Sequence, residues 1–176
     1  NFGRGNATSI DGSSYSYYYQ ISDSLGIIML DSNRYDINGD PTLTYTSGQI
    51  KEETLNWLDK TLSNTKSNNI DVIVTSHHNI FTHSTIFIDS YQIKNHDKLE
   101  QLLTKYNVRL YLSGHMHIQH QENKNNLTEV LTSALSITPH QYGIIEYNSK
   151  SNLLYNYYTQ KVDVSNYSKI NNTGYF

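Results

Sequence analysis

The sequence predicts an α/β protein in which helices flank a mixed β-sheet. Asp71–Ser76 is a nearly continuous β-branched apolar run, which is typical of a strand covered on both faces. A helical segment from about Asp97 to Tyr106 follows it, and Val108–Ser113 is a second apolar strand. Because a strand–helix–strand crossover makes its two strands parallel, these segments predict one βαβ unit.

The elements upstream of this unit are a hairpin and a helix. Ser14–Ile21 and Leu25–Leu30 predict two strands joined by a tight turn, and the polar residues 1–14 and Ser32–Tyr45 predict loops. From about Ser47 to Ser63, apolar residues recur with helical spacing, which predicts an amphipathic helix.

Downstream, Asp97 and Glu100 have the spacing of a capping box at the start of the second helix. Residues 83–95 carry no regular pattern and predict irregular structure. Further strands are expected near Glu129–Thr132, Gln141–Tyr147 and Leu153–Thr159. We assign residues 1–162 to one domain and residues 163–176 to a polar C-terminal tail.

Composition excludes several classes of function. The 176 residues carry a net charge of −3, with 13 basic residues and no Lys/Arg-rich stretch, which argues against a nucleic-acid-binding patch. The absence of cysteine excludes disulfides, thiolate metal sites and a cysteine nucleophile. The longest apolar runs, such as Leu25–Leu30, are far shorter than the roughly 20 residues that cross a bilayer, so no membrane span is expected.

The chain starts at Asn1 without an initiator Met, which predicts that it is a piece of a longer protein. No signal-peptide pattern opens it. The composition is compatible with a cytosolic protein and with an extracellular or cell-surface bacterial one, so the sequence leaves the localisation open.

Histidines follow both strands of the predicted βαβ unit. His77 and His78 come directly after the first strand, and Gly114-His115-Met116-His117 comes directly after the second. Because parallel strands end at the same edge of a sheet, where ligands of open α/β sheets bind, we expect these imidazoles to meet at one rim.

The Gly-His-Met-His segment has a direct physical interpretation. An extended chain points alternate side chains the same way, so His115 and His117 are expected to project together, with Met116 turned away. Neutral imidazole suits Zn, Fe, Mn or Ni, and we therefore predict His77, His115 and His117 as metal ligands. On an extended chain His78 would point elsewhere, either to contact substrate or to line the rim.

The remaining histidines favour other interpretations. His83 and His140 are expected at the surface of loops, and His120 is expected to be exposed just beyond the Gly-His-Met-His segment. His96 is most simply part of a helix start.

Two segments carry a family resemblance. Val72–Asn79 (VIVTSHHN) and Leu110–His117 (LYLSGHMH) resemble the last two motifs of the calcineurin-like metallophosphoesterase superfamily, a strand ending in histidine and a strand ending in Gly-His-x-His. Ser14–Tyr17 followed by Leu25–Ser32 resembles the hairpin of the bacterial secreted or lipoprotein-type branch. Leu55–Leu58 resembles its amphipathic helix, and Tyr142–Ile145 resembles a late core strand. The resemblance covers most of residues 2–160.

The resemblance implies a two-sheet α/β/β/α sandwich, of which this chain would supply the C-terminal half. It implies a two-metal hydrolase with Mn, Fe or Zn, in which His77 and His115 bind one ion and His117 binds the other. The substrate would be a small phosphate mono- or diester or a cyclic-nucleotide-like molecule. No catalytic residue beyond the metal ligands is implied for this chain.

The chain also departs from the family pattern. It holds none of the family's Asp-x-His, Gly-Asp and Gly-Asn-His-Asp/Glu motifs, and Gly39-Asp40, Gly5-Asn6 and Asn95-His96-Asp97 are not substitutes for them. We therefore expect a chain that is inactive alone and depends on the N-terminal half of its protein. The alternative is a non-catalytic surface domain with a structural metal site or none.

Overall fold

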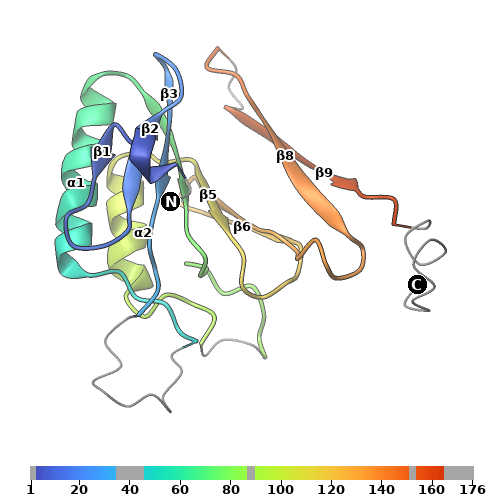
Figure 1. The fold of residues 1–176 in the computed structure, drawn as a ribbon. Helices are drawn as coiled ribbons and strands as arrows, with labels where there is room; N and C mark the ends of the chain where they lie inside the picture. Colours follow the sequence, from blue (N-terminus) through green and yellow to red (C-terminus); the bar gives the residue numbers. More distant parts are fainter. Residues whose placement is uncertain (1–2, 35–45, 87–89, 151–153, 165–176) are drawn as a thin grey trace.

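The computed structural model describes residues 3–34, 46–86, 90–150 and 154–164 (Figure 1). The predicted loop 32–45 falls partly outside these residues, and so does the predicted tail from 165 onward. Within the described part of the chain, no helix is long and apolar enough to cross a membrane.

A seven-stranded mixed sheet forms the centre of the molecule, which confirms the predicted fold class. In spatial order the strands are β1 (Ser9–Ile10), β2 (Tyr17–Gln20), β3 (Leu25–Met29), β4 (Asp71–Thr75), β5 (Leu110–Ser113), β7 (Leu127–Leu131) and β6 (His120–Lys124). The four neighbouring strands β3, β4, β5 and β7 are parallel, while β1, β2 and β6 pair antiparallel at the two sides.

Two helices, α1 (Glu52–Ser67) and α2 (His96–Lys105), lie side by side on one face of this sheet (Figure 1). Their leucines pack against the central strands, where burial of apolar area is the main stabilising term. The core formed in this way includes Leu58, Leu62, Val74, Leu99, Leu103 and Tyr111, none of which is exposed by more than 1%. The β4–α2–β5 crossover is the predicted βαβ unit, and its two strands are parallel as expected.

A separate antiparallel pair, β8 (Gln141–Tyr147) and β9 (Tyr155–Lys161), stands on the other side of the sheet (Figure 1). Ile145, Tyr155 and Tyr157 of this pair pack on a smaller apolar cluster of the main sheet. The Tyr147 hydroxyl also donates to a carboxylate of β4, Oδ2 of Asp71, at 2.7 Å. The hairpin is thus attached to the outer face by apolar contacts and one charged hydrogen bond.

The first helix starts later than predicted, at Glu52 instead of Ser47. Residues 46–50 are instead held in an extended path by hydrogen bonds to other loops. The backbone N–H of Gln49 donates to the Ser32 carbonyl, and Asn95 pairs through its side chain with both backbone groups of Ile50. These contacts come from distant segments, so local helical spacing misplaces the boundary.

The predicted capping box of the second helix is wrong. The helix begins at His96, and Asn95 before it makes no side-chain cap. Glu100 is 8% exposed, and its carboxylate accepts hydrogen bonds from Lys124 and Asn125 in place of the helix N-terminus. A tertiary ion pair has replaced the local cap.

Two strands were missed by the sequence prediction, β1 in the N-terminal loop and β6 at the sheet edge. The polar composition of β6 gives no apolar alternation to detect. It is instead created by the turn at Asn125 and Asn126, whose φ values of 54° and 63° suit a hairpin turn of type I′.

Candidate metal centre

The two histidine-bearing segments leave the sheet at the same edge. β4 and β5 run parallel, and His77 and Gly114 follow their carboxyl ends. The pairing continues past the strands, because the N–H of Ser76 donates to the Leu112 carbonyl and the N–H of Gly114 donates to the His77 carbonyl. The prediction that topology brings these segments together is therefore confirmed.

Three imidazoles gather at this edge. Nε2 of His77 and Nδ1 of His115 lie 2.9 Å apart, and one ring nitrogen from each of His77, His78 and His115 falls within 4.8 Å of the others. The ring centroids of His77 and His78 are 5.0 Å apart, and those of His78 and His115 are 4.7 Å apart. His77 is exposed, His115 is half-buried and His78 is buried.

Partial burial favours the neutral form of these rings. It lowers the pKa of His77, and the nearby charges of His115 and His117 lower it further. Burial also lowers the pKa of His115, with an opposing contribution from the Ser90 carbonyl. For His78 burial lowers the pKa to about 4. Neutral imidazole is the form that binds metal ions.

The Gly-His-Met-His segment is not extended, so the alternation argument is wrong. His115 and His117 have φ values of 68° and 57°, and the N–H of Met116 donates to the Gly114 carbonyl at 2.8 Å. Left-handed backbone at non-glycine residues is strained and tends to occur at functional sites. The turn places His115 in the imidazole group, while the exposed His117 lies outside it, near enough for its charge to lower the pKa of both His77 and His115.

His78 lies beside His77 and is fixed by two protein contacts, contrary to the prediction that it points away. Its Nε2 lies 2.9 Å from the Thr46 carbonyl, which can only accept, so Nε2 donates. Nδ1, 2.8 Å from Oγ of Ser32, then accepts from that hydroxyl. A Cβ on Gly48 would come within 2.5 Å of the ring, so this glycine allows the loop to pass. Both ring nitrogens of His78 are occupied by these contacts.

A buried carboxylate on β7, missed by the sequence analysis, ties the two ligand segments together. Glu129 is 0% exposed and accepts hydrogen bonds from the backbone N–H groups of Ile80 and Phe81, at 3.0 and 2.6 Å. It also accepts from the Ser113 hydroxyl at 2.6 Å. Ile80 and Phe81 follow His77, and Ser113 is the last residue of β5. A glutamate inside an otherwise apolar strand was the available signal, since such residues are seldom buried without partners.

The other histidines differ in part from expectation. His83 and His140 are both 8% exposed, so the prediction of surface positions is wrong. His120 is exposed and His96 is the first residue of α2, and both outcomes agree with the sequence analysis. The burial of His83 depends on a distant residue, since its Nε2 lies 3.0 Å from Oε2 of Glu129 on β7, which local sequence does not reveal.

The donor set fits part of a metal centre. At bond lengths of roughly 2.0–2.1 Å, two nitrogens bound to one ion at right angles stand roughly 2.9 Å apart, and two in a tetrahedral set stand roughly 3.3–3.4 Å apart. Nε2 of His77 and Nδ1 of His115, 2.9 Å apart, match the right-angled arrangement. Among the described residues no carboxylate joins the group. The imidazoles present therefore fit one ion, and a second ion needs further ligands.

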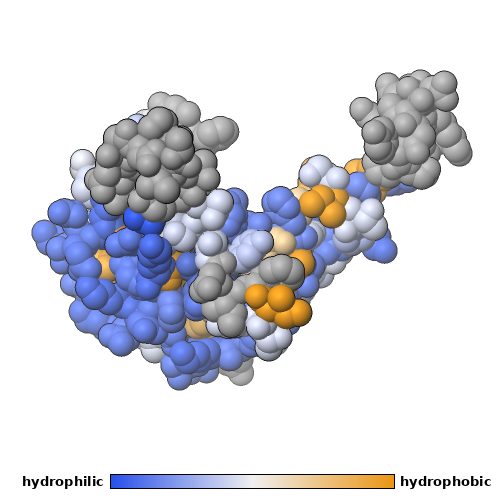
Figure 2. Space-filling view, turned by 90° about the horizontal axis from the view of Figure 1, so that it is seen from below, coloured by the Kyte–Doolittle hydropathy of each residue, from blue (hydrophilic) through white to orange (hydrophobic). Residues whose placement is uncertain are grey.

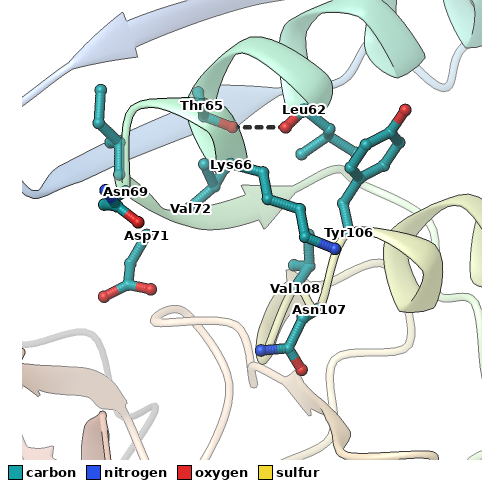
Figure 3. A pocket seen from close by; sticks show the side chains of 10 residues that line it. Leu62, Thr65, Lys66, Asn69, Asp71, Val72, Tyr106, Asn107 and Val108 are labelled. Carbon is teal, nitrogen blue, oxygen red and sulfur yellow. Dashed lines mark hydrogen bonds between the residues drawn. The ribbon is translucent and has the colours of Figure 1, made fainter.

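A cavity at the opposite edge of the sheet is unrelated to this chemistry. It measures about 220 Å³ and is lined by residues that include Leu62, Lys66, Asp71, Tyr106 and Val108 (Figure 3). It lies where β4 begins, away from the imidazoles, and its lining contains no histidine.

Comparison with known proteins identifies the class. The sequence profile of calcineurin-like phosphoesterases matches residues 4–119, well over half of the chain, and the chain belongs to this family. The fold is similar to a dimetal phosphatase from Danio rerio, with a TM-score of 0.58, 16% sequence identity, and coverage of 73% of this chain and 52% of that one.

A second similar structure is that of GAP50, the anchor in the inner membrane complex of Plasmodium. Its TM-score is 0.50 at 20% identity, over 85% of this chain and 44% of that one. The chain thus spans about half the length of both proteins. A search of curated proteins gave no match to the sequence.

Proposed function

We propose that this chain contributes imidazole ligands to a two-metal centre that hydrolyses a phosphate mono- or diester. The observation that carries the proposal is the 2.9 Å separation of Nε2 of His77 from Nδ1 of His115, at the carboxyl ends of adjacent parallel strands. Membership of the calcineurin-like phosphoesterase family supports it.

His77 and His115 hold one ion in this proposal, and His117 reaches the other. Mn, Fe or Zn are the ions that imidazole donors suit. When bound, the two ions supply Lewis acidity toward the phosphoryl group. The chain's own contribution is to hold neutral rings at a fixed separation.

His78 and Glu129 act as positioning residues in the same proposal. Because both nitrogens of His78 are engaged by Ser32 and Thr46, it orients the rim and binds neither metal nor substrate. Glu129 fixes the spacing of the two ligand segments through their backbone and Ser113. This replaces the predicted substrate contact of His78.

The carboxylates that a two-metal centre requires come, we propose, from the N-terminal half of the same protein. Among the described residues, no carboxylate oxygen joins the group of ring nitrogens that lie within 4.8 Å of one another. Seen from below, toward the edge where the parallel strands end, the surface outside the grey residues is mostly hydrophilic (Figure 2), which suits a small, charged, phosphorylated substrate. The chain alone is then expected to show little or no turnover.

The test is hydrolysis of p-nitrophenyl phosphate and bis(p-nitrophenyl) phosphate with Mn²⁺ by protein in which residues 1–176 are joined to their upstream half. His77→Ala and His115→Ala should each abolish turnover, and His96→Ala, a partly exposed histidine on α2, should leave it unchanged. Undiminished hydrolysis by the His77→Ala/His115→Ala protein would end the proposal. Full turnover by the 176-residue chain alone would contradict the division between halves.

The second candidate is a non-catalytic domain that keeps the fold. It is favoured by the similarity to GAP50, which is described as an anchor, and a fold by itself does not fix function. Metal binding without hydrolysis of either ester by the joined protein would select this candidate.

A further inference from the structure

A second pair of imidazoles lies outside the candidate centre. Nδ1 of His83 and Nδ1 of His120 are 2.9 Å apart, with ring planes at 89° and centroids 5.2 Å apart. The two residues are 37 positions apart in sequence, so the tertiary fold brings them together. Neither belongs to the group of His77, His78 and His115.

The inner ring of this pair is oriented by a carboxylate. The side chain of His83 is 0% exposed, and its Nε2 lies 3.0 Å from Oε2 of Glu129, which is also fully buried. This contact is oblique, since Nε2 makes no regular hydrogen bond within the described residues. In the tautomer of His83 that carries its proton on Nε2, this N–H lies beside the carboxylate and the lone pair of Nδ1 faces His120.

This arrangement is the one found around metal-binding histidines. Such residues almost always direct their second nitrogen at a carboxylate, a carbonyl or water, which fixes the ring and raises its basicity. The separation of the two Nδ1 atoms equals that between His77 and His115. It also equals the roughly 2.9 Å expected for two nitrogens bound at right angles, at roughly 2.0–2.1 Å, to one square-planar or octahedral ion.

The outer ring leaves room for further ligands. His120 is exposed and is the first residue of the edge strand β6, which pairs with β7 alone among the described strands. An ion held between the two rings would face solvent, and water could complete its coordination.

We propose that His83 and His120 form a second metal site, which binds one late first-row divalent ion such as Cu²⁺, Ni²⁺ or Zn²⁺. Imidazole pairs favour these ions and discriminate against Mg²⁺ and Ca²⁺, which prefer oxygen ligands. The inference does not rest on phosphoester hydrolysis, because neither histidine belongs to the proposed centre.

The test uses the 176-residue chain without an affinity tag, carrying His77→Ala and His115→Ala so that the first centre is removed. Titration with Cu²⁺, followed by electron paramagnetic resonance, should show one bound equivalent with two nitrogen donors that excess Mg²⁺ does not displace. Adding His120→Ala should remove this equivalent. Adding His96→Ala instead should leave it in place, since His96 lies on α2 and its ring pairs with Asp97.

Should the double variant fail to fold, the unmodified chain gives the same answer. Substoichiometric Cu²⁺ should broaden the imidazole NMR signals of His83 and His120, and His120→Ala should lower the copper stoichiometry by one equivalent. Equal stoichiometry in the parent and in His120→Ala would overturn the proposal and leave a simple hydrogen bond between His83 and His120. Loss of hydrolysis in His77→Ala, measured separately, reports only on the first centre.

Discussion

The two ligand-bearing segments of the candidate centre are held in different ways. The segment after β4, with His77 and His78, is tied down by hydrogen bonds to Ser32, Thr46 and Glu129. The segment after β5 is a tight turn with left-handed backbone at His115 and His117. One segment is positioned by its surroundings and the other by its own backbone conformation. The difference teaches that two candidate ligands can be brought to one group by different means, one by tertiary hydrogen bonds and the other by a strained turn.

The largest effect on stability is expected from removing Glu129, the buried carboxylate that holds the segment after β4 in place. Glu129→Ala leaves the N–H groups of Ile80 and Phe81 and the Ser113 hydroxyl without their acceptor. Each unsatisfied buried group costs ~1–3 kcal/mol, so the free energy of unfolding should fall by at least ~3 kcal/mol. Urea denaturation measures this, and Glu53→Ala, at an exposed position of α1, serves as the control, with a small change only. A loss similar to that control would refute the anchoring role.

A smaller effect is expected where the loop of residues 46–48 meets His78. Gly48→Ala puts a Cβ 2.5 Å from the ring, and such overpacking should lower the free energy of unfolding by ~1–3 kcal/mol.

Because we propose His78 as a positioning residue, His78→Ala should weaken Mn²⁺ binding by about 10–100-fold. Isothermal calorimetry of the joined protein measures the affinity, with His96→Ala as the matched variant. Unaltered Mn²⁺ affinity in His78→Ala would show that the tether is dispensable.

A buried carboxylate far from the imidazoles tests whether such tethers stabilise the chain generally. Asp11 is 3% exposed and accepts hydrogen bonds from Ser13, Ser14 and Thr54, the last on α1. Burial raises its pKa most, but these hydrogen bonds together outweigh burial and leave the pKa below 3.8.

A carboxylate whose pKa is lower in the folded state than in the unfolded state stabilises the fold at pH values above its unfolded-state pKa. This stabilisation is lost as the pH falls through the folded-state pKa. Asp11→Asn should therefore lower the free energy of unfolding by ~1–2 kcal/mol at neutral pH. The difference in free energy of unfolding between Asp11→Asn and the parent chain should narrow as the pH falls below 3.8. Urea denaturation across this range checks both points, and a gap that widens in acid would contradict the sign.

The smallest effect on stability is expected in the strained turn of His115 and His117. There a substitution should stabilise the chain, whereas the preceding changes destabilise it. His117→Gly places glycine where φ is 57°, which relieves strain but adds freedom to the unfolded chain. The metal-free chain should become slightly more stable, by ~0.5 kcal/mol, whereas His77→Gly in the tethered segment should be destabilising. Thermal unfolding in the presence of a chelator compares them. A destabilised His117→Gly chain would show that the turn is not strained.

Much of the fold follows from patterns that act over short distances. The β-branched run before His77 and the apolar strand before Gly114 predicted β4 and β5, and the crossover rule made them parallel. That alone placed His77 and His115 at one edge. By contrast, the starts of α1 and α2, the strand β6 and the burial of His83 escaped prediction, because each depends on partners far away in the chain.

The sequence by itself determined the fold class, the parallel arrangement of two strands and the edge at which the imidazoles collect. Only the tertiary structure decided which nitrogens of His78 are occupied, that Glu129 joins the two ligand segments, and that His83 faces His120. The physical reason is one of range. Strand and helix periodicity is a property of neighbouring residues, whereas burial and side-chain orientation are set by contacts between residues tens of positions apart.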